Sequence, residues 1–166
     1  SLRDDPQFYL SMMEQSYIYE EMGSMKEALH FAKEAVSMND NNLDYQKRLA
    51  FLYIDSGRFE ESLACLKKLV DFEPNRFYNW YAYSEVLMLI GEFEDAITVL
   101  NEATKLHNRA EIYYQLSNCY FHMNNQKECR KALDVALNLD PNLLEDMKLK
   151  YPFIKEEVEK VKTKKK

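Results

Sequence analysis

The residues of this sequence that could carry out chemistry are few, and most of them stand alone. Cys119, His122 and Cys129 have the residue types that bind zinc, and residues 119 and 122 share one face of a helix. A fourth ligand is missing, and Cys129 stands where matching points of the chain carry a small packing residue. We therefore expect no metal site.

The sequence also lacks grouped residues suited to acid–base or nucleophilic catalysis. Neighbouring glutamates on a helix point about 100° apart, so their carboxylates cannot converge on a substrate. The three histidines are isolated, no serine or cysteine stands in a nucleophile elbow, and the glycines are too scattered for a phosphate-binding loop. The sequence predicts no catalytic residue, no cofactor and no enzymatic activity. The glutamate pairs in question are Glu20-Glu21, Glu60-Glu61 and Glu156-Glu157.

The composition narrows the class of partner. The net charge of −6 and the pI near 5.2 argue against nucleic acid as the main ligand, because phosphate binding needs a basic surface. Residues 1–142 carry 23 acidic against 14 basic side chains, whereas residues 143–166 carry 5 against 8. No apolar run is long enough to cross a bilayer, and three cysteines favour a reducing, cytoplasmic compartment over a disulfide framework. We expect no membrane association.

A repeat of 34 residues organises the chain. Its only glycines, Gly23, Gly57 and Gly91, are spaced at this interval, and Asn124 follows where the next is due. Glycine and, next best, asparagine end helices in the left-handed conformation. Small residues 12 apart bracket each of these turns, which indicates two helices in close contact. The small pairs are Ser16 with Ala28, Ala50 with Ser62, Ser84 with Ala96, and Ser117 with Cys129.

The pattern resembles the tetratricopeptide repeat, in which a large aromatic residue stands near the start of each unit and a proline near its end. Trp80 and Pro74 match those positions, whereas Met12, Gln46 and Asp40 depart from them. The resemblance implies an all-α protein: a right-handed α-solenoid of stacked helix-turn-helix repeats with C-terminal capping helices. The expected parts are the tail of a preceding repeat at 1–8, repeats at 9–42, 43–76, 77–109 and 110–143, and capping helices with a basic tail at 144–166. With Pro6 at the closing position of that preceding repeat, we expect a longer array or multidomain protein.

The resemblance also implies a concave groove lined by the first helix of each repeat. The groove positions carry many aromatic side chains, which favours a peptide with aromatic or aliphatic anchors and an acidic group near Lys47 and Arg48. The carboxylate clamp of chaperone-binding repeats is absent, because Ala82 stands where the clamp needs asparagine. About half of the set, Phe121 included, is expected to pack in the core. The candidate groove residues are Met13, Tyr17, Lys47, Arg48, Phe51, Tyr78, Tyr81, Glu85, Tyr114, Asn118 and Phe121.

These features favour a non-catalytic scaffold that binds a protein or peptide partner, as part of a larger protein. The alternative is a self-association module, in which exposed aromatic residues pair with another copy of the chain. A helical-repeat reader of nucleic acid is a third hypothesis, and the net acidity disfavours it. The style of the aromatic-rich repeats and of the cap favours a bacterial, cytoplasmic protein.

Overall fold

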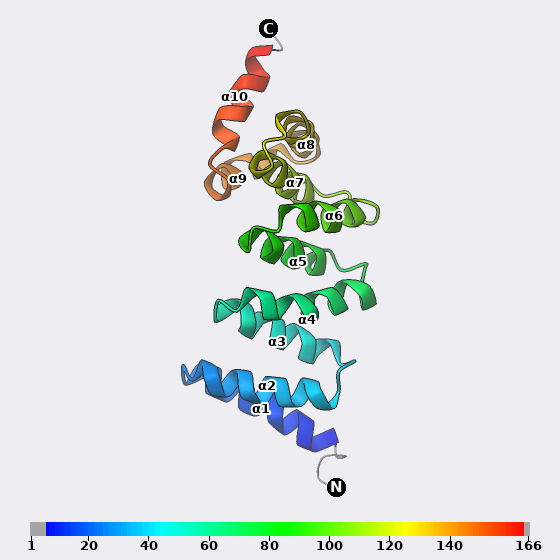
Figure 1. Ribbon diagram of the computed structural model, residues 1–166, viewed down its shortest axis with the longest axis vertical. Helices are drawn as coiled ribbons and strands as arrows, with labels where there is room; N and C mark the ends of the chain where they lie inside the picture. The colour runs from blue at the N-terminus through cyan, green and yellow to red at the C-terminus, as the bar shows by residue number, and fades with distance from the viewer. Residues whose placement is uncertain (1–5, 165–166) are drawn as a thin grey trace. The chain divides into compact units, whose positions relative to one another are not determined.

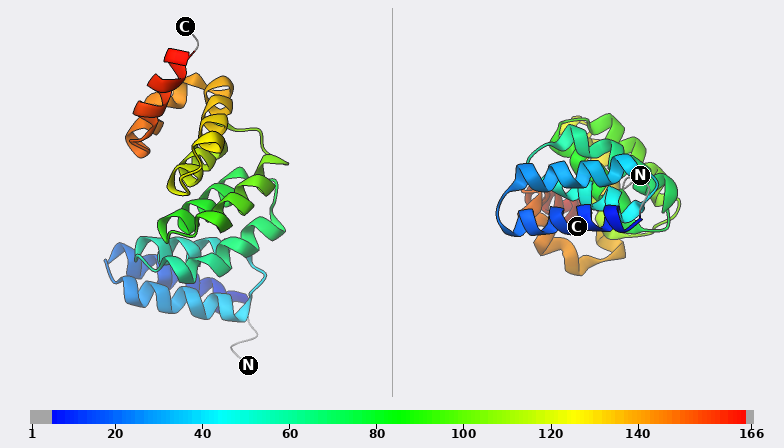
Figure 2. Two further views of the ribbon diagram at one scale, coloured as in Figure 1. Left: turned by 45° about the horizontal axis from the view of Figure 1, so that its top comes forward. Right: turned by 90° about the horizontal axis from the view of Figure 1, so that it is seen from below.

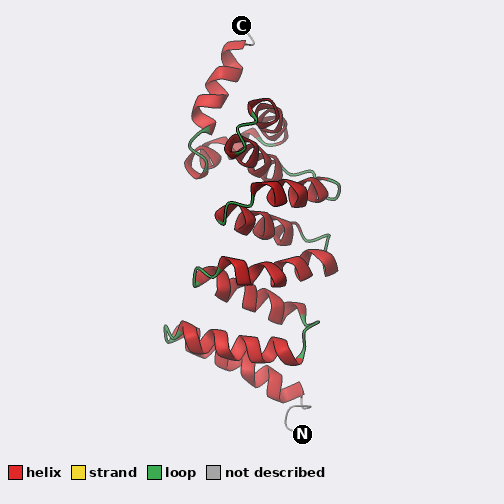
Figure 3. Ribbon diagram, viewed as in Figure 1, coloured by secondary structure: helices red, strands yellow, loops and turns green. Residues whose placement is uncertain are grey.

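The computed structural model describes residues 6–164, and within that range the chain is helical and contains no strand (Figure 3). The all-α prediction is confirmed. No helix in the described range is both long and apolar enough to span a bilayer. The helices are α1 (Pro6–Glu21), α2 (Met25–Met38), α3 (Leu43–Asp55), α4 (Phe59–Phe72), α5 (Phe77–Leu89), α6 (Phe93–Thr104), α7 (Ala110–His122), α8 (Gln126–Leu139), the short η2 (Pro141–Leu143), α9 (Leu144–Lys150) and α10 (Ile154–Lys164).

The chain forms two compact units, Ser1–Asn79 and Trp80–Lys166, which are described separately below as unit 1 and unit 2. In unit 1, α1 packs against α2, α2 against α3, and α3 against α4, and the two helices of a pair run antiparallel (Figures 1 and 2). In unit 2, α7 packs against both α6 and α8. Helix α5 begins in unit 1 and continues into unit 2.

The helix pairs fall within the ranges expected for the repeats, with one difference at the start. Pro6 is the first residue of α1, where the sequence had suggested the closing position of a preceding repeat. Proline suits the first turn of a helix, because the amide hydrogen that it lacks has no acceptor there. Residues 1–5 of the expected tail and Lys165-Lys166 of the basic tail lie outside the described residues. The repeat boundaries themselves stay predictions.

The turn inside each helix pair has the predicted left-handed residue. Gly23, Gly57 and Gly91 have φ angles of +74°, +71° and +85°, and no atom lies within 4 Å of the place that a Cβ would take. Conformation rather than lack of space therefore explains the choice of glycine. The next residue closes each turn by donating its amide hydrogen back into the helix, as Ser24 does to the carbonyl of Tyr19 at 2.8 Å.

Asn124 takes the same turn position with φ +56°, as the sequence predicted. Replacing Asn124 by alanine is expected to lower the free energy of unfolding by about 1 kcal/mol. Alanine has a Cβ that disfavours the left-handed conformation, and it lacks the short polar side chain with which asparagine can form local hydrogen bonds. Replacing it by glycine should leave stability near that of the unmodified protein. Urea unfolding followed by circular dichroism measures both variants. Equal effects of alanine and glycine would contradict this account of the turn.

The small residues predicted at the helix contacts are all buried. In the first pair the hydroxyl of Ser16 donates a hydrogen bond of 2.9 Å to the carbonyl of Ala28 on the facing helix. Ser62 and Ser84 instead donate to carbonyls of their own helices, which satisfies their hydroxyls without separating the pair. Cys129 is completely buried, so the larger thiol is accommodated at the same position.

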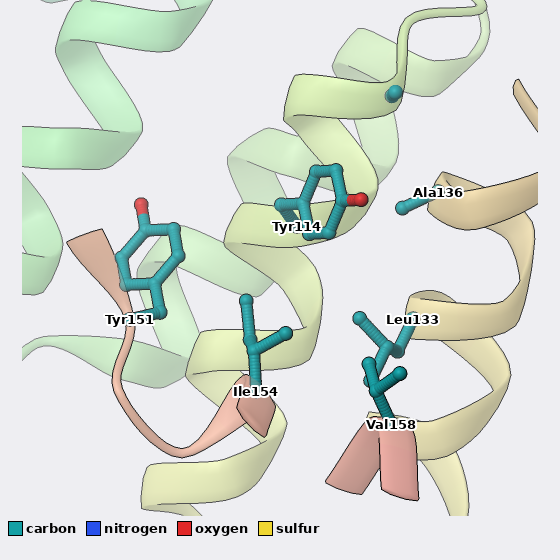
Figure 4. Packing of buried hydrophobic residues seen from close by; sticks show 7 residues of the cluster. Tyr114, Leu133, Ala136, Tyr151, Ile154 and Val158 are labelled. Carbon is teal, nitrogen blue, oxygen red and sulfur yellow. The ribbon is translucent and has the colours of Figure 1, made fainter. Parts of the chain in front are cut away.

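The chain beyond α8 covers the last repeat. Tyr151, Ile154 and Val158 form one buried cluster with Tyr114 of α7 and Leu133 of α8 (Figure 4). A repeat array needs such a cover, because its terminal helices otherwise present apolar side chains to water. The predicted capping role of residues 144–166 thus has a physical basis in α9 and α10.

Candidate functional site

The first helices of unit 1 expose aromatic rings. Tyr17 of α1 and Phe51 of α3 are 34 residues apart, so they take the same place in successive repeats, and they are 52% and 53% exposed. Tyr78, in the first turn of α5, is 73% exposed. Position 85 of α5 is the equivalent of Tyr17 and Phe51, and Tyr78 stands seven residues before it. Because seven residues are close to two helical turns, Tyr78 lies on the same side of α5 as position 85. We call these three residues the aromatic face of unit 1.

Arg48 is a buried part of unit 1 rather than an open anion site. Its guanidinium forms an ion pair of 2.5 Å with Glu20 and donates to the carbonyl of Ser16 at 3.2 Å. The same group lies 3.8 Å from the centre of the Tyr17 ring, so a cation–π contact holds that ring in place. The sequence suggested that Arg48 would receive an acidic group of a ligand, and the structure corrects this because Glu20 already fills that role.

Lys47 is also engaged within unit 1. Its ammonium lies 2.9 Å from a carboxylate oxygen of Glu73. This hydrogen bond is the main reason why the pKa of Glu73 lies below its ordinary value, although partial burial opposes it. With both cations paired internally, the charge left exposed on α1 and α3 is largely acidic. The exposed carboxylates on these two helices are Glu14, Glu21, Asp44 and Asp55.

In unit 2 the chain's own C-terminal part contacts the first helices. Lys150 donates a hydrogen bond of 2.7 Å to the phenol oxygen of Tyr81 and forms an ion pair with Glu85. The ring of Phe153 stacks on that of Phe121, with centroids 4.3 Å apart and planes 11° from parallel. Residues 150–153, here called the C-terminal segment, therefore engage three of the side chains that the sequence assigned to the groove.

The electrostatics of Lys150 reflect this arrangement. Partial burial acts to lower its pKa, but the hydrogen bonds to Glu85 and Tyr81 outweigh burial, and the pKa lies above its ordinary value. The ammonium also lies 4.9 Å from the centre of the Tyr81 ring. Lys150 is therefore a charged group held by one carboxylate and one aromatic ring.

Several predicted groove residues are buried, which corrects the expectation that they face a ligand. Tyr114 is completely buried beneath Tyr151 and Ile154, and burial raises the pKa of its phenol to about 12. Asn118 is buried with its amide 3.4 Å from the sulfur of Met88, and Met13 belongs to the core of unit 1. Tyr81, Glu85 and Phe121 keep partial exposure beside the C-terminal segment.

A hollow remains open next to the C-terminal segment. One part of about 550 Å³ is lined by Phe121 and Phe153, and an adjoining part of about 330 Å³ by Glu85 and Met88. These volumes are in the range of pockets that hold small ligands or side chains. The two parts share four lining residues, so they lie next to each other. The shared residues are Asn118, His122, Lys150 and Tyr151.

The described thiol and imidazole groups, which could act as nucleophiles or metal ligands, do not form a common site. Cys119 and Cys129 are completely buried, and burial raises their thiol pKa values to about 12 and about 11, whereas His122 is exposed. Cys65 is buried in unit 1, and its pKa is likewise raised to about 11. A protonated thiol is a poor nucleophile and metal ligand. Within residues 6–164, no three His, Cys, Asp or Glu side chains are grouped so that they could hold a metal ion.

Sequence reasoning missed Lys150 and the pairing of Phe153 with Phe121. One signal was present: residues 143–166 have a basic excess, whereas the preceding chain is acidic. Opposite charge along one chain favours contact between its parts. The identity of the contact, however, depends on the path of the backbone after α8, which no local pattern specifies.

Comparison with known proteins agrees with the helix pairs described above. A family model described as tetratricopeptide repeat matches residues 20–82, and one described as anaphase-promoting complex, cyclosome, subunit 3 matches residues 66–136. Human protein O-mannosyl-transferase TMTC1 is 25% identical over 134 residues, which are 80% of this chain but 15% of that protein. The chain thus spans a small part of the curated relative that it matches.

Solved structures of MamA have the same fold. One crystal structure of MamA has a TM-score of 0.73 and 20% identity, covering 93% of this chain and 88% of that one. MamA from Desulfovibrio magneticus RS-1, residues 41 to the end, has a TM-score of 0.69 and 21% identity, covering 93% and 92%. At these identities the likeness concerns the fold alone.

Proposed function

Because this chain belongs to the tetratricopeptide-repeat proteins, we propose that it is a non-catalytic scaffold that binds a segment of a partner protein on the aromatic face of unit 1. A cytoplasmic location is part of the same proposal. The observation that carries it is the exposure of Tyr17, Phe51 and Tyr78, each more than half accessible. Large exposed aromatic groups on one face are typical of interaction surfaces, and tyrosine is a frequent anchor of binding energy.

The charge around the face favours one class of partner. Helix α1 carries three glutamates and no basic residue, and the two cations of α3 are paired within unit 1. A basic partner segment with apolar anchors complements this surface, whereas an acidic one is repelled. The ring of Tyr17 is already fixed by Arg48, so little conformational freedom is lost when a ligand contacts it.

Two synthetic helical peptides test the proposal. Both carry leucine and tryptophan anchors along one face, and the other positions are lysine in one peptide and glutamate in the second. In fluorescence anisotropy we expect the lysine peptide to bind at least about tenfold more tightly, with an affinity that falls as salt is added. The double variant Tyr17→Ala with Phe51→Ala should weaken its binding about tenfold, the effect of losing about 1.4 kcal/mol of anchor energy.

Phe72→Ala is the matched control, because Phe72 is an exposed aromatic residue of α4, outside the aromatic face. It should leave peptide binding unchanged. Equal losses from the double variant and from Phe72→Ala would contradict the proposal. If instead the mass measured by light scattering rises with concentration and the double variant abolishes that rise, the face serves self-association, which is the alternative function.

A further inference from the structure

We infer that the first-helix face of unit 2 is a second binding site, specific for a partner segment that carries a lysine followed three residues later by an aromatic ring. Lys150 and Phe153 of this chain have that spacing and occupy the site themselves. The inference rests on the proposed function, because it assigns a ligand chemistry to a second surface of the same scaffold. Its occupant is a partner segment with the chemistry that the C-terminal segment displays.

The contacts of the C-terminal segment define what the site recognises. Glu85 and Tyr81 of α5 together hold one ammonium group, through an ion pair and a hydrogen bond of 2.7 Å. Phe121 of α7 offers the face of its ring to a second ring. A carboxylate beside an aromatic ring favours a lysine, and a parallel ring favours another aromatic side chain.

These contacts are separate from those that hold the cap in place. Tyr151, Ile154 and Val158 are buried in the cluster with Tyr114 and Leu133, and they anchor α10 whether or not the outer contacts form. Lys150 and Phe153, in contrast, are partly exposed. Exposed ion pairs contribute little and weaken with salt, so a partner with the same groups can replace them without unfolding the cap.

The space beside the segment is large enough for such a partner. The hollow of about 550 Å³ adjoins Phe121 and Phe153, and the part of about 330 Å³ adjoins Glu85. Tyr151, which is itself buried, lines both parts of this space.

The test uses a labelled peptide with the sequence of residues 147–156 and the full chain carrying Lys150→Ala and Phe153→Ala. With the internal groups removed, the peptide should bind about tenfold more tightly than to the unmodified chain, as measured by fluorescence anisotropy. Adding Glu85→Gln to this variant should return the peptide affinity to that of the unmodified chain. A peptide with alanine at the position of Lys150 should likewise bind the test variant no more tightly than the unmodified chain. Circular dichroism checks that the helices are retained.

The matched control is Leu149→Ala with Lys155→Ala, which removes one apolar side chain and one charge from the same part of the chain. Leu149 is 78% exposed and Lys155 is exposed, and this control should bind the peptide as weakly as the unmodified chain. Equal binding by the control and the test variant would overturn the inference. Tyr17→Ala with Phe51→Ala, made in both the test variant and the unmodified chain, removes any binding of this basic peptide at unit 1, and the tenfold difference between the two should persist. Failure at unit 1 and failure at unit 2 are thereby distinguished.

Should the test variant fail to fold, a variant with a smaller change provides a second measurement. This variant is Lys150→Ala alone, because it retains Phe153 and the buried cluster. The same labelled peptide should bind Lys150→Ala severalfold more tightly than the unmodified chain, and adding Glu85→Gln should remove this gain. Binding of the peptide to Lys150→Ala no tighter than to the unmodified chain would overturn the inference.

Discussion

Replacing Ile154 by alanine is expected to lower the free energy of unfolding by about 2–5 kcal/mol, the range for a large aliphatic side chain removed from a packed core. Ile154 is completely buried between α7 and α8, where it covers Tyr114 and Leu133. Its loss leaves a cavity at the point where the cap meets the last repeat. Urea unfolding followed by circular dichroism measures the effect.

The control for this prediction is Leu149→Ala, an aliphatic truncation five residues earlier at a side chain that is mostly exposed. It should change stability by less than about 0.5 kcal/mol. Because repeat arrays can unfold in parts, the loss in Ile154→Ala should be greatest for probes in unit 2. A loss of similar size in both variants would mean that the cap does not depend on this side chain.

Replacing Glu157 by glutamine is expected to cost about 2 kcal/mol near neutral pH, because hydrogen bonds to a charged group are stronger than those to a neutral one. Glu157 of α10 is buried, and its carboxylate accepts hydrogen bonds from Arg130 of α8 at 2.9 Å and from Lys160 at 3.0 Å. Burial acts to raise the pKa of Glu157, but these two cations outweigh it and the pKa lies below the ordinary 4.5.

Because the pKa of Glu157 is lowered, the difference in stability between the unmodified protein and Glu157→Gln depends on pH in a defined direction. A carboxyl whose pKa is lower in the folded state contributes stability above its unfolded pKa and loses it as pH falls through the folded pKa. The gap in stability between the unmodified protein and Glu157→Gln should therefore be constant above about pH 6 and shrink below about pH 4.5. Glu156→Gln, at the exposed neighbouring carboxylate, should show no such gap. A gap that does not change with pH would contradict the role given to the ionised form.

The parts of the fold that follow from local backbone geometry could be predicted from the sequence. Gly23, Gly57, Gly91 and Asn124 mark the left-handed turns, because few residue types tolerate a positive φ. The small pairs such as Ser16 with Ala28 mark the helix contacts, because close approach of two helices excludes large side chains. Both signals report on residues within one repeat.

The candidate site could be predicted only in part, because exposure depends on distant segments. Arg48 follows Lys47 and looks like part of an open basic pair, yet Glu20, 28 positions earlier, neutralises it. Tyr114 has the pattern of a groove residue, but Ile154, 40 positions later, covers it. Tyr17, in contrast, is 52% exposed although Arg48 contacts its ring, and its role in binding stays a prediction.

The burial of all three thiols has a practical consequence for experiments in solution. Maleimide reagents attack the thiolate, and Cys65, Cys119 and Cys129 are both shielded and held in the protonated form. A cysteine engineered onto the surface therefore labels selectively while the protein is intact. Slow modification of the native thiols then measures how often the helices come apart enough to admit reagent.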